Sequence, residues 1–233
     1  ATSPRALMRE DDLSAWGWRP AWLPKSAETG LEAGATLGDT SPQDWLIFAD
    51  EAGLADTTAD RLRDAGHQVT MVRAGDSFAE LSDGSFLLAP EQGRDGYDML
   101  MLRLSEMERL PTRIAHFWLV TEAETFRPGS SFFYRNAEHG FYSLMYLAQA
   151  LSTQELDDLH ITVLPSGAAR VADEALPYPE KALISGPVGV IPREMPGVTC
   201  STLDIEMPQR RTAVGPNCAP QGPRPRRAPS WSR

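Results

Sequence analysis

The sequence predicts an α/β protein in which a mainly parallel sheet lies between two layers of helices. Short apolar runs alternate with stretches of helical periodicity from residue 45 onward, which is the order in which a parallel sheet is built. The chain has 233 residues, of which 42% are hydrophobic, enough for one domain with a real core. The first apolar run also leads through a short turn into a helical stretch, as in a nucleotide-binding β–α unit.

Each element follows from its local pattern. Strands are expected at residues 45–49, 68–72, 86–88, 114–120, 160–164 and 198–205, and helices at 57–65, 97–107 and 139–151. The first helix should end at Gly66, because glycine takes the left-handed C-cap conformation without steric cost. In the third helix, the spacing of apolar residues predicts a core face made of Phe141, Leu144, Met145, Ala148 and Leu151, opposite Tyr142, Tyr146 and Gln149.

The composition divides the chain into three parts. Residues 1–44 are expected to be a linker with a Trp-rich strand at residues 16–22, and residues 45–207 to be the folded domain. Prolines between residues 177 and 196 should interrupt regular helix, leaving only a short one at residues 180–185. Residues 208–233 hold six prolines and six arginines, a composition that predicts a disordered tail.

Charge and cysteine content limit the classes of partner. The net charge is −10, and without the basic tail the body carries −16, which disfavours binding to nucleic acid or to an anionic membrane. The two cysteines, Cys200 and Cys218, fit no common metal motif, and a reducing cytoplasm suits them best. No apolar run has the length of a spanning helix, and the N-terminus has no signal-peptide core.

The turn after the first predicted strand lacks nucleotide-binding chemistry. A dinucleotide-binding protein carries three spaced glycines there, which let backbone amides approach a diphosphate. Residues 50–56 of this chain contain one glycine, Gly53, and three carboxylates, Asp50, Glu51 and Asp56. Like charges at a few ångströms would raise the energy of a bound diphosphate, so we expect a scaffold without a cofactor site.

Several segments together resemble the N-terminal structural half of a ketoreductase from a modular type I polyketide synthase. They are Trp18-Arg19-Pro20-Ala21-Trp22, the strand–turn–helix at residues 45–66, the strand and helix at 114–120 and 140–151, and the series Pro179-Glu180-Lys181, Gly186-Pro187 and Val190-Ile191-Pro192-Arg193-Glu194. The last series, which precedes the predicted strand at 198–205, is the most specific. The resemblance covers about residues 16–207.

The resemblance implies a truncated Rossmann-like three-layer fold, a pseudo-Rossmann subdomain that binds no cofactor. In this family a second half carries the glycine-rich NADPH turn and the catalytic Lys, Ser and Tyr. The implied partners are that catalytic half, other domains of the megasynthase and an acyl carrier protein, whose β-ketoacyl thioester the parent enzyme reduces to a β-hydroxyacyl thioester. The implied location is cytoplasmic, and this chain alone is expected to be non-catalytic.

The residues themselves support no catalytic, cofactor-binding or metal site. A reductase tyrosine needs a nearby cation to favour its ionised form, yet Tyr142 is followed four residues on by Tyr146, and the two lysines, Lys25 and Lys181, stand beside no suitable tyrosine in the sequence. The histidines are scattered, and His139, at an expected helix start, is interpreted as a capping residue. They are His67, His116, His139 and His160.

Nucleophilic and acid–base chemistry are no better supported. Ser130, Ser166 and Ser185 each adjoin a glycine without forming a nucleophile elbow, and the pairs Asp11-Asp12 and Asp157-Asp158 stand in expected linker or loop. Two alternatives stay open. One is a self-standing NADPH-dependent short-chain-type reductase with an atypical site, and the other is an interaction module that docks through its basic tail.

Overall fold

A seven-stranded sheet forms the middle of the protein in the computed structural model, which describes residues 41–121, 132–154, 158–170, 176 and 178–207. The strand order is β3-β4-β2-β1-β5-β6-β7, and every neighbouring pair is parallel except β3 with β4. The strands are β1 (Asp44–Ala49), β2 (Gln68–Ala74), β3 (Ala79–Glu80), β4 (Phe86–Leu88), β5 (Arg113–His116), β6 (Leu159–Val163) and β7 (Val198–Thr202). The predicted fold class is confirmed.

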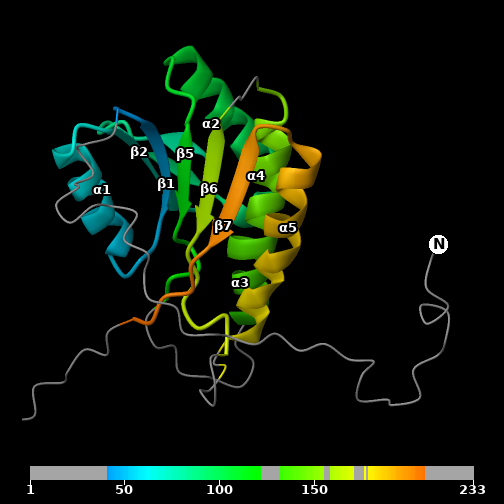
Figure 1. Cartoon of the computed structure of the whole chain (residues 1–233). Helices are drawn as coiled ribbons and strands as arrows, with labels where there is room; N and C mark the ends of the chain where they lie inside the picture. The colour runs from blue at the N-terminus through cyan, green and yellow to red at the C-terminus, as the bar shows by residue number, and fades with distance from the viewer. Residues whose placement is uncertain (1–40, 122–131, 155–157, 171–175, 177, 208–233) are drawn as a thin grey trace, which may run out of the picture.

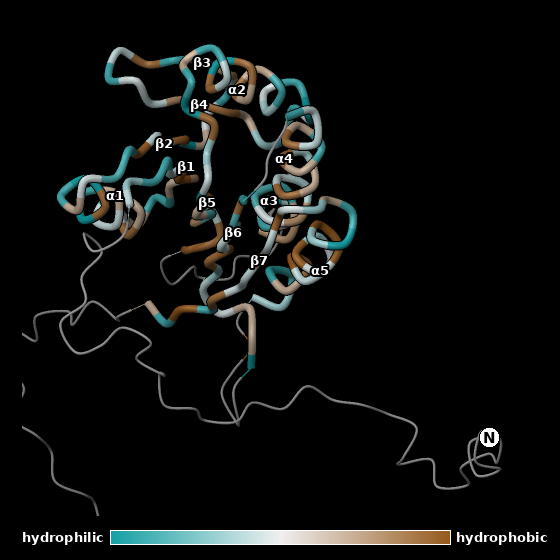
Figure 2. The backbone as a smooth tube through the Cα atoms, turned by 45° about the horizontal axis from the view of Figure 1, so that its top comes forward, coloured by the Kyte–Doolittle hydropathy of each residue, from teal (hydrophilic) through white to brown (hydrophobic). Residues whose placement is uncertain are grey.

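Helices lie on both faces of this sheet (Figures 1 and 2). The helix α1 (Leu54–Asp64) packs on one face, where its Ala55, Ala59 and Leu62 contact a core that includes Ile47 and Met71. The opposite face carries α2 (Asp95–Glu106), α3 (Phe132–Ala137), α4 (Ser143–Leu151) and α5 (Ser185–Glu194). The larger apolar core lies beneath these helices. Short 3-10 helices, η4 (Pro90–Gln92) and η6 (Pro179–Ile184), precede α2 and α5.

The first β–α unit starts its helix earlier than predicted. Helix α1 begins at Leu54 rather than near Thr57, after Gly53 takes a left-handed conformation with φ of 88°. Its end agrees with the sequence pattern, because Gly66 has φ of 89° and the His67 amide donates to the Leu62 carbonyl at 3.0 Å. This is the hydrogen bond of a Schellman C-cap.

The third predicted helix contains a π-helical turn that the apolar pattern did not show. The π-helix η5 (Glu138–Tyr142) lies between α3 and α4, and its wider turn shifts the helix face that follows. The buried residues are therefore Leu144, Leu147, Ala150 and Leu151, while Phe141, Met145 and Ala148 are only partly buried. The predicted core face was half right, and the interpretation of His139 as a cap was wrong, because it lies inside this continuous helical run.

The Pro-rich segment is helical, contrary to the prediction. Helix α5 contains Pro187 and Pro192. Pro187 stands in the first turn, where its missing N–H has no helical partner to lose, and Pro192 stands close to the helix end at Glu194. Pro192 has no N–H to donate to the carbonyl four residues before it, at Val188, so the helix lacks that one hydrogen bond and ends two residues later.

Two smaller differences concern the strands. Strand β5 ends at His116, four residues before the predicted end, because residues 117–120 turn away with the Val120 amide donating to the Phe117 carbonyl at 2.7 Å. The two-residue edge strand β3 had no recognisable pattern. The expected linker strand at residues 16–22 and the expected tail at residues 208–233 lie outside the described residues.

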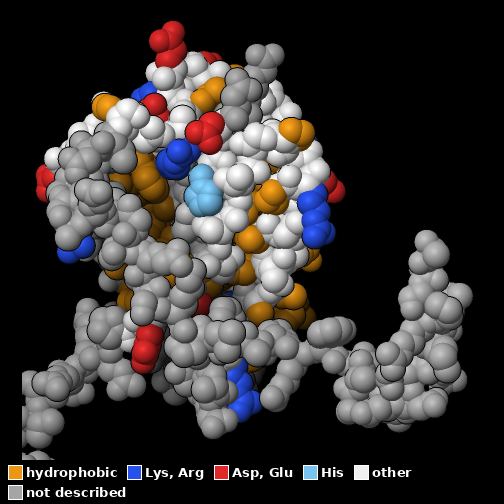
Figure 3. Space-filling model, in the orientation of Figure 1, with side chains coloured by type: hydrophobic (Ala, Val, Ile, Leu, Met, Phe, Trp, Pro, Cys, Tyr) orange, Lys and Arg blue, Asp and Glu red, His pale blue; other side chains and the backbone are white. Residues whose placement is uncertain are grey.

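The sheet face on the α1 side changes character from β1 to β7. It is apolar over β1 and β2, but over β6 and β7 it carries His160, Thr162, Thr199 and Ser201. The His160 ring bonds Thr199 Oγ1 at 2.7 Å and Ser201 Oγ at 2.9 Å. Figure 3, drawn in the orientation of Figure 1, shows a histidine and a basic side chain surrounded by white atoms, which are uncharged polar side chains and backbone. Within the described part of the chain, no helix packs on these two strands from this side.

None of the helices in the described ranges combines the length and the apolar composition that spanning a lipid bilayer requires.

Candidate functional site: the carboxyl edge of the sheet

The place to look for a ligand site is the edge where the parallel strands end. From β1 the chain continues to β2 on one side, while β5 lies on the other. In open α/β sheets the loops diverge at such a switch point and leave a crevice in which ligands bind. A ligand site of this fold would therefore lie among the turn after β1, the segment after β5 and the segment after β6.

The Asp50 carboxylate closes the turn after β1. Asp50 follows directly on the strand and is only 4% exposed. Its Oδ2 accepts a hydrogen bond from the Leu54 amide at 3.1 Å, and its Oδ1 accepts one from the Ala55 amide at 2.7 Å. These are the first amides of α1, which have no partner inside the helix. The negative charge also lies at the positive end of the helix dipole, where it is stabilised.

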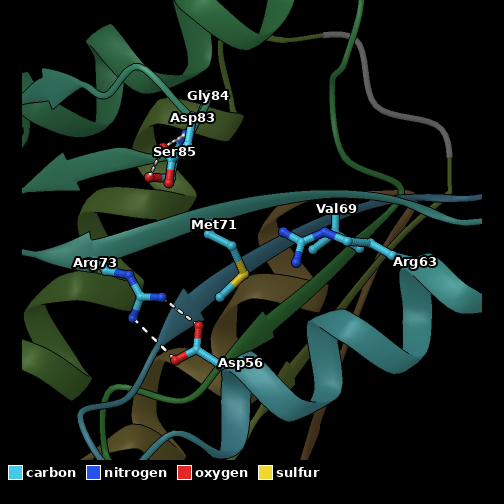
Figure 4. Close-up of a pocket in the computed structure, with 8 residues that line it drawn as sticks. All are labelled: Asp56, Arg63, Val69, Met71, Arg73, Asp83, Gly84 and Ser85. Carbon is cyan, nitrogen blue, oxygen red and sulfur yellow. Dashed lines mark hydrogen bonds and ion pairs between the residues drawn. The ribbon is translucent and has the colours of Figure 1, made fainter.

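A second carboxylate, in the first turn of α1, pairs with the end of β2. Asp56 Oδ1 lies 2.5 Å from an Arg73 guanidinium nitrogen, and Figure 4 shows the two side chains pointing toward each other. Arg73 stands opposite Ala49, the last residue of β1. The pair borders a shallow hollow of about 160 Å³ whose other lining residues include Arg63 and Asp83. Asp83 accepts hydrogen bonds from the Ser85 side chain and amide, which lower its pKa.

An exposed ion pair crosses from the β1–α1 turn to the helical run after β5. Arg135 of α3 lies 3.4 Å from the Glu51 carboxylate. Arg135 is about one-third exposed and Glu51 is almost fully exposed, so the pair contributes little to stability. Its position, however, links two segments that follow the neighbouring strands β1 and β5.

A buried lysine joins the ends of β5 and β6. Lys181 of η6 is fully buried, and its Nζ donates to Thr121 Oγ1 at 2.7 Å and to the Ser166 carbonyl at 3.0 Å. Ser166 Oγ lies 3.3 Å from the same nitrogen and accepts the Thr121 amide at 3.1 Å. Lys181 Nζ also lies 4.1 Å from the centre of the Tyr178 ring. A desolvated ammonium needs this number of oxygen partners.

A buried imidazole and hydroxyl pair lies deeper, under the helices. His116, the last residue of β5, has its Nε2 2.9 Å from Ser143 Oγ, and both residues are fully buried. Burial lowers the pKa of His116 to about 3, and burial beside Arg135 lowers that of His139 to about 4. Burial likewise raises the pKa of the neighbouring Tyr97 hydroxyl. The pair has no route to a substrate, so a Ser–His arrangement here serves packing.

The residues considered from the sequence do not converge on one site. Tyr142 and Tyr146 stack on each other with ring centres 6.3 Å apart, and Ser185 begins α5. Asp158 lies 3.6 Å from Arg113. Lys25, Ser130, Asp11, Asp12, Asp157 and Cys218 lie outside the described residues. Among the described residues, no three His, Cys, Asp or Glu side chains are placed to hold a metal ion.

Sequence reasoning missed the roles of Asp50 and Lys181. Asp50 was read only as a charge that repels a phosphate, and its hydrogen bonds depend on the turn conformation set by Gly53. Lys181 was set aside because no tyrosine stands four residues before it. Tyr178 stands three residues before it, and the 3-10 geometry of η6 brings the ring and the ammonium together.

These features define a Rossmann-like domain in which charged side chains at the carboxyl edge of the sheet bind other groups of the same chain. The chain belongs to the family described as beta-ketoacyl synthase-like, N-terminal, whose model matches residues 43–214.

Several solved structures share the fold of this chain. The adenylation, ketoreductase and pseudo Asub multidomain structure of a keto acid-selecting NRPS module matches with 25% identity and a TM-score of 0.64, over 73% of this chain and 14% of that one. An N-terminal ketoreductase from the macrolactin assembly line matches with 19% identity and a TM-score of 0.57, over 70% of this chain and 32% of that one. A short-chain dehydrogenase/reductase from Vibrio parahaemolyticus shares the fold, with 12% identity and a TM-score of 0.50, over 69% and 83%.

No curated protein sequence matches the chain. The family and the ketoreductase structures confirm the predicted identity, the N-terminal structural subdomain of a polyketide synthase ketoreductase. The chain spans only 14% and 32% of the two synthase structures that it matches.

Proposed function

We propose that this chain scaffolds the NADPH-dependent catalytic half of a polyketide synthase ketoreductase and binds no cofactor itself. The parent enzyme would reduce a β-ketoacyl thioester, presented by an acyl carrier protein, to a β-hydroxyacyl thioester in the cytoplasm. The catalytic half and neighbouring synthase domains would be the partners. The ketoreductase-containing structures that share this fold are the comparison behind the proposal.

The observation that carries the proposal is the state of the β1–α1 turn. A dinucleotide needs free amides at the N-terminus of α1 and a glycine-lined approach to them. Here the Leu54 and Ala55 amides donate to Asp50 at 3.1 and 2.7 Å. The residues present do not fit a diphosphate, so the reductase chemistry is assigned to another part of the synthase.

The proposal predicts two results that one set of proteins can test. The purified chain should show no micromolar NADPH binding by calorimetry. Produced together with the catalytic, glycine-turn half of a polyketide synthase ketoreductase, it should copurify with that half and raise the yield of folded, active reductase. Micromolar NADPH binding by the chain alone would refute the scaffold assignment.

The rival function is a self-standing reductase with an atypical site. The Tyr178 and Lys181 side chains are the described pair that such a site would use, but the Lys181 ammonium is fully buried and bonded to Thr121 and Ser166. Turnover of a β-ketoacyl thioester model compound with NADPH by the chain alone would favour the rival. We expect none.

A further inference from the structure

We infer that Asp50 is a built-in substitute for a bound phosphate, which keeps the first β–α unit folded without a cofactor. In nucleotide-binding relatives of this fold, the diphosphate satisfies the first amides of the helix after β1. A half that binds no nucleotide would leave these amides and the positive end of the helix dipole without an anion. The Asp50 carboxylate supplies that anion from within the chain.

The geometry supports replacement rather than ordinary helix capping. The residue at the N-cap position is Gly53, which has no side chain to cap with. Asp50 stands three residues earlier, at the end of β1, and reaches the Leu54 and Ala55 amides with both oxygens. Its carboxylate is therefore held at the carboxyl edge of the sheet, on the approach that a diphosphate would use, and it is nine-tenths buried.

An independent contact repeats the pattern at the end of β2. In nucleotide-binding folds, a residue about 20 positions after the glycine turn recognises the adenosine ribose, and an arginine nearby accommodates a 2′-phosphate. Arg73 stands at this place, in register with the last residue of β1. Its guanidinium pairs with Asp56 at 2.5 Å. Two carboxylates of the first β–α unit, one before α1 and one in its first turn, thus pair with groups that would bind phosphates in a nucleotide-binding fold.

The test is whether an external anion replaces the missing carboxylate. Asp50→Ala and Asp50→Ser should lower the melting temperature of the full chain by roughly 3–6 °C, which is the usual size of a lost cap in a protein of this length. Inorganic phosphate, added at constant ionic strength, should restore about half or more of that loss. The melting temperature of Asp50→Asn, which keeps an acceptor but no charge, should lie between those of the wild type and Asp50→Ala.

The matched control is Asp60→Ala, because Asp60 lies on the exposed side of the same helix and pairs only with Arg63 at 3.3 Å. Wild type and this control should gain no more from phosphate than from chloride. The inference is overturned if Asp50→Ala melts with wild type, or if phosphate stabilises all proteins equally. It rests on the proposed function in one respect, that this chain binds no cofactor, and failure of the scaffolding role would show separately as a chain that does not associate with the reductase half.

Discussion

The two sides of the carboxyl edge are closed by opposite charges. At the end of β1, a carboxylate lies among backbone amides. At the ends of β5 and β6, an ammonium lies among a carbonyl and two hydroxyls. Each charge is surrounded by dipoles oriented to stabilise it, as a buried ion requires. The difference is in what the charge ties together, because Asp50 closes a turn within one β–α unit whereas Lys181 joins three segments far apart in sequence.

Removal of the charge should therefore lower the stability of the protein by different amounts on the two sides. Loss of Asp50 exposes the first turn of one helix, a local defect. Loss of Lys181 removes the donor to the half-buried Thr121 hydroxyl and to the Ser166 carbonyl, and with it the side-chain link from η6 to the ends of β5 and β6. We therefore expect perturbations on the β5–β6 side to be the larger ones.

Acid should produce the largest effect, through the buried bases behind β5. His116 and His139 stay neutral in the folded chain because burial lowers their pKa to about 3 and about 4. In the unfolded chain both take up a proton below their ordinary pKa of about 6.5. Unfolding therefore takes up protons in this range, so stability is full above pH 6.5 and falls as the pH drops toward 4, by on the order of 3–6 kcal/mol.

Urea unfolding at a series of pH values measures this loss. The double variant His116→Phe with Ser143→Ala should lose less stability between pH 7 and pH 4 than Ser143→Ala alone, because it lacks one of the two bases. Parallel pH profiles for the two variants would show that His116 does not contribute, and that carboxylates account for the acid sensitivity.

Replacement of the buried lysine comes next. Lys181→Met keeps the side-chain length but removes the donor to Thr121 Oγ1 and Ser166, and should cost about 3 kcal/mol in the free energy of unfolding. The matched control is Glu180→Gln, at the neighbouring position. In the wild type Glu180 Oε1 accepts from Asn136 Nδ2 at 2.7 Å, and the glutamine keeps an oxygen that can accept the same hydrogen bond. A Lys181→Met protein as stable as this control would remove the distinction between the two sides of the edge.

A methyl group at the η5–η6 contact should have a smaller effect. A Cβ at Gly140 would meet Leu119 Cδ1 at 2.7 Å and Ile184 Cγ2 at 3.1 Å, so in Gly140→Ala these two side chains, or η5 itself, must shift. Overpacking of this kind costs about 1–3 kcal/mol. Gly189→Ala, with open space around its position, is the control and should be neutral or slightly stabilising in thermal unfolding. Equal melting temperatures for the two variants would mean that the contact yields without strain.

The sequence predicted the sheet and the acidic turn because both depend on local patterns. The apolar runs of β1, β2, β6 and β7 stand near their predicted places, and the missing glycines after β1 were visible at once. The helical part was harder. The π-helical turn at Glu138–Tyr142 changes the period that any helical count assumes. In α5, Pro187 stands in the first turn, where its missing N–H costs no helical hydrogen bond, and Pro192 stands two residues before the helix ends.

The candidate site was out of reach for a related reason. Lys181 meets Thr121 and Ser166 across 60 and 15 residues, and no spacing rule connects them. The α1-side surface of β6 and β7, a network of hydroxyls around His160, likewise follows from strand register and from no local pattern. Such partners depend on topology, which brings distant strand ends together.

The smallest effect should come from the ion pair between Glu51 and Arg135, which joins the β1–α1 turn to α3. Glu51→Gln removes the charge that faces Arg135 at 3.4 Å, but Glu51 is almost fully exposed, so water and salt already screen the pair. The free energy of unfolding should change by less than about 0.5 kcal/mol, and Asp60→Ala, at another exposed pair of this region, should change it equally little. A loss of stability as large as the one expected for Asp50→Ala would mean that the Glu51–Arg135 contact itself holds the two sides of the edge together. The buried Asp50 and the exposed Glu51 would then no longer differ in their effect on stability.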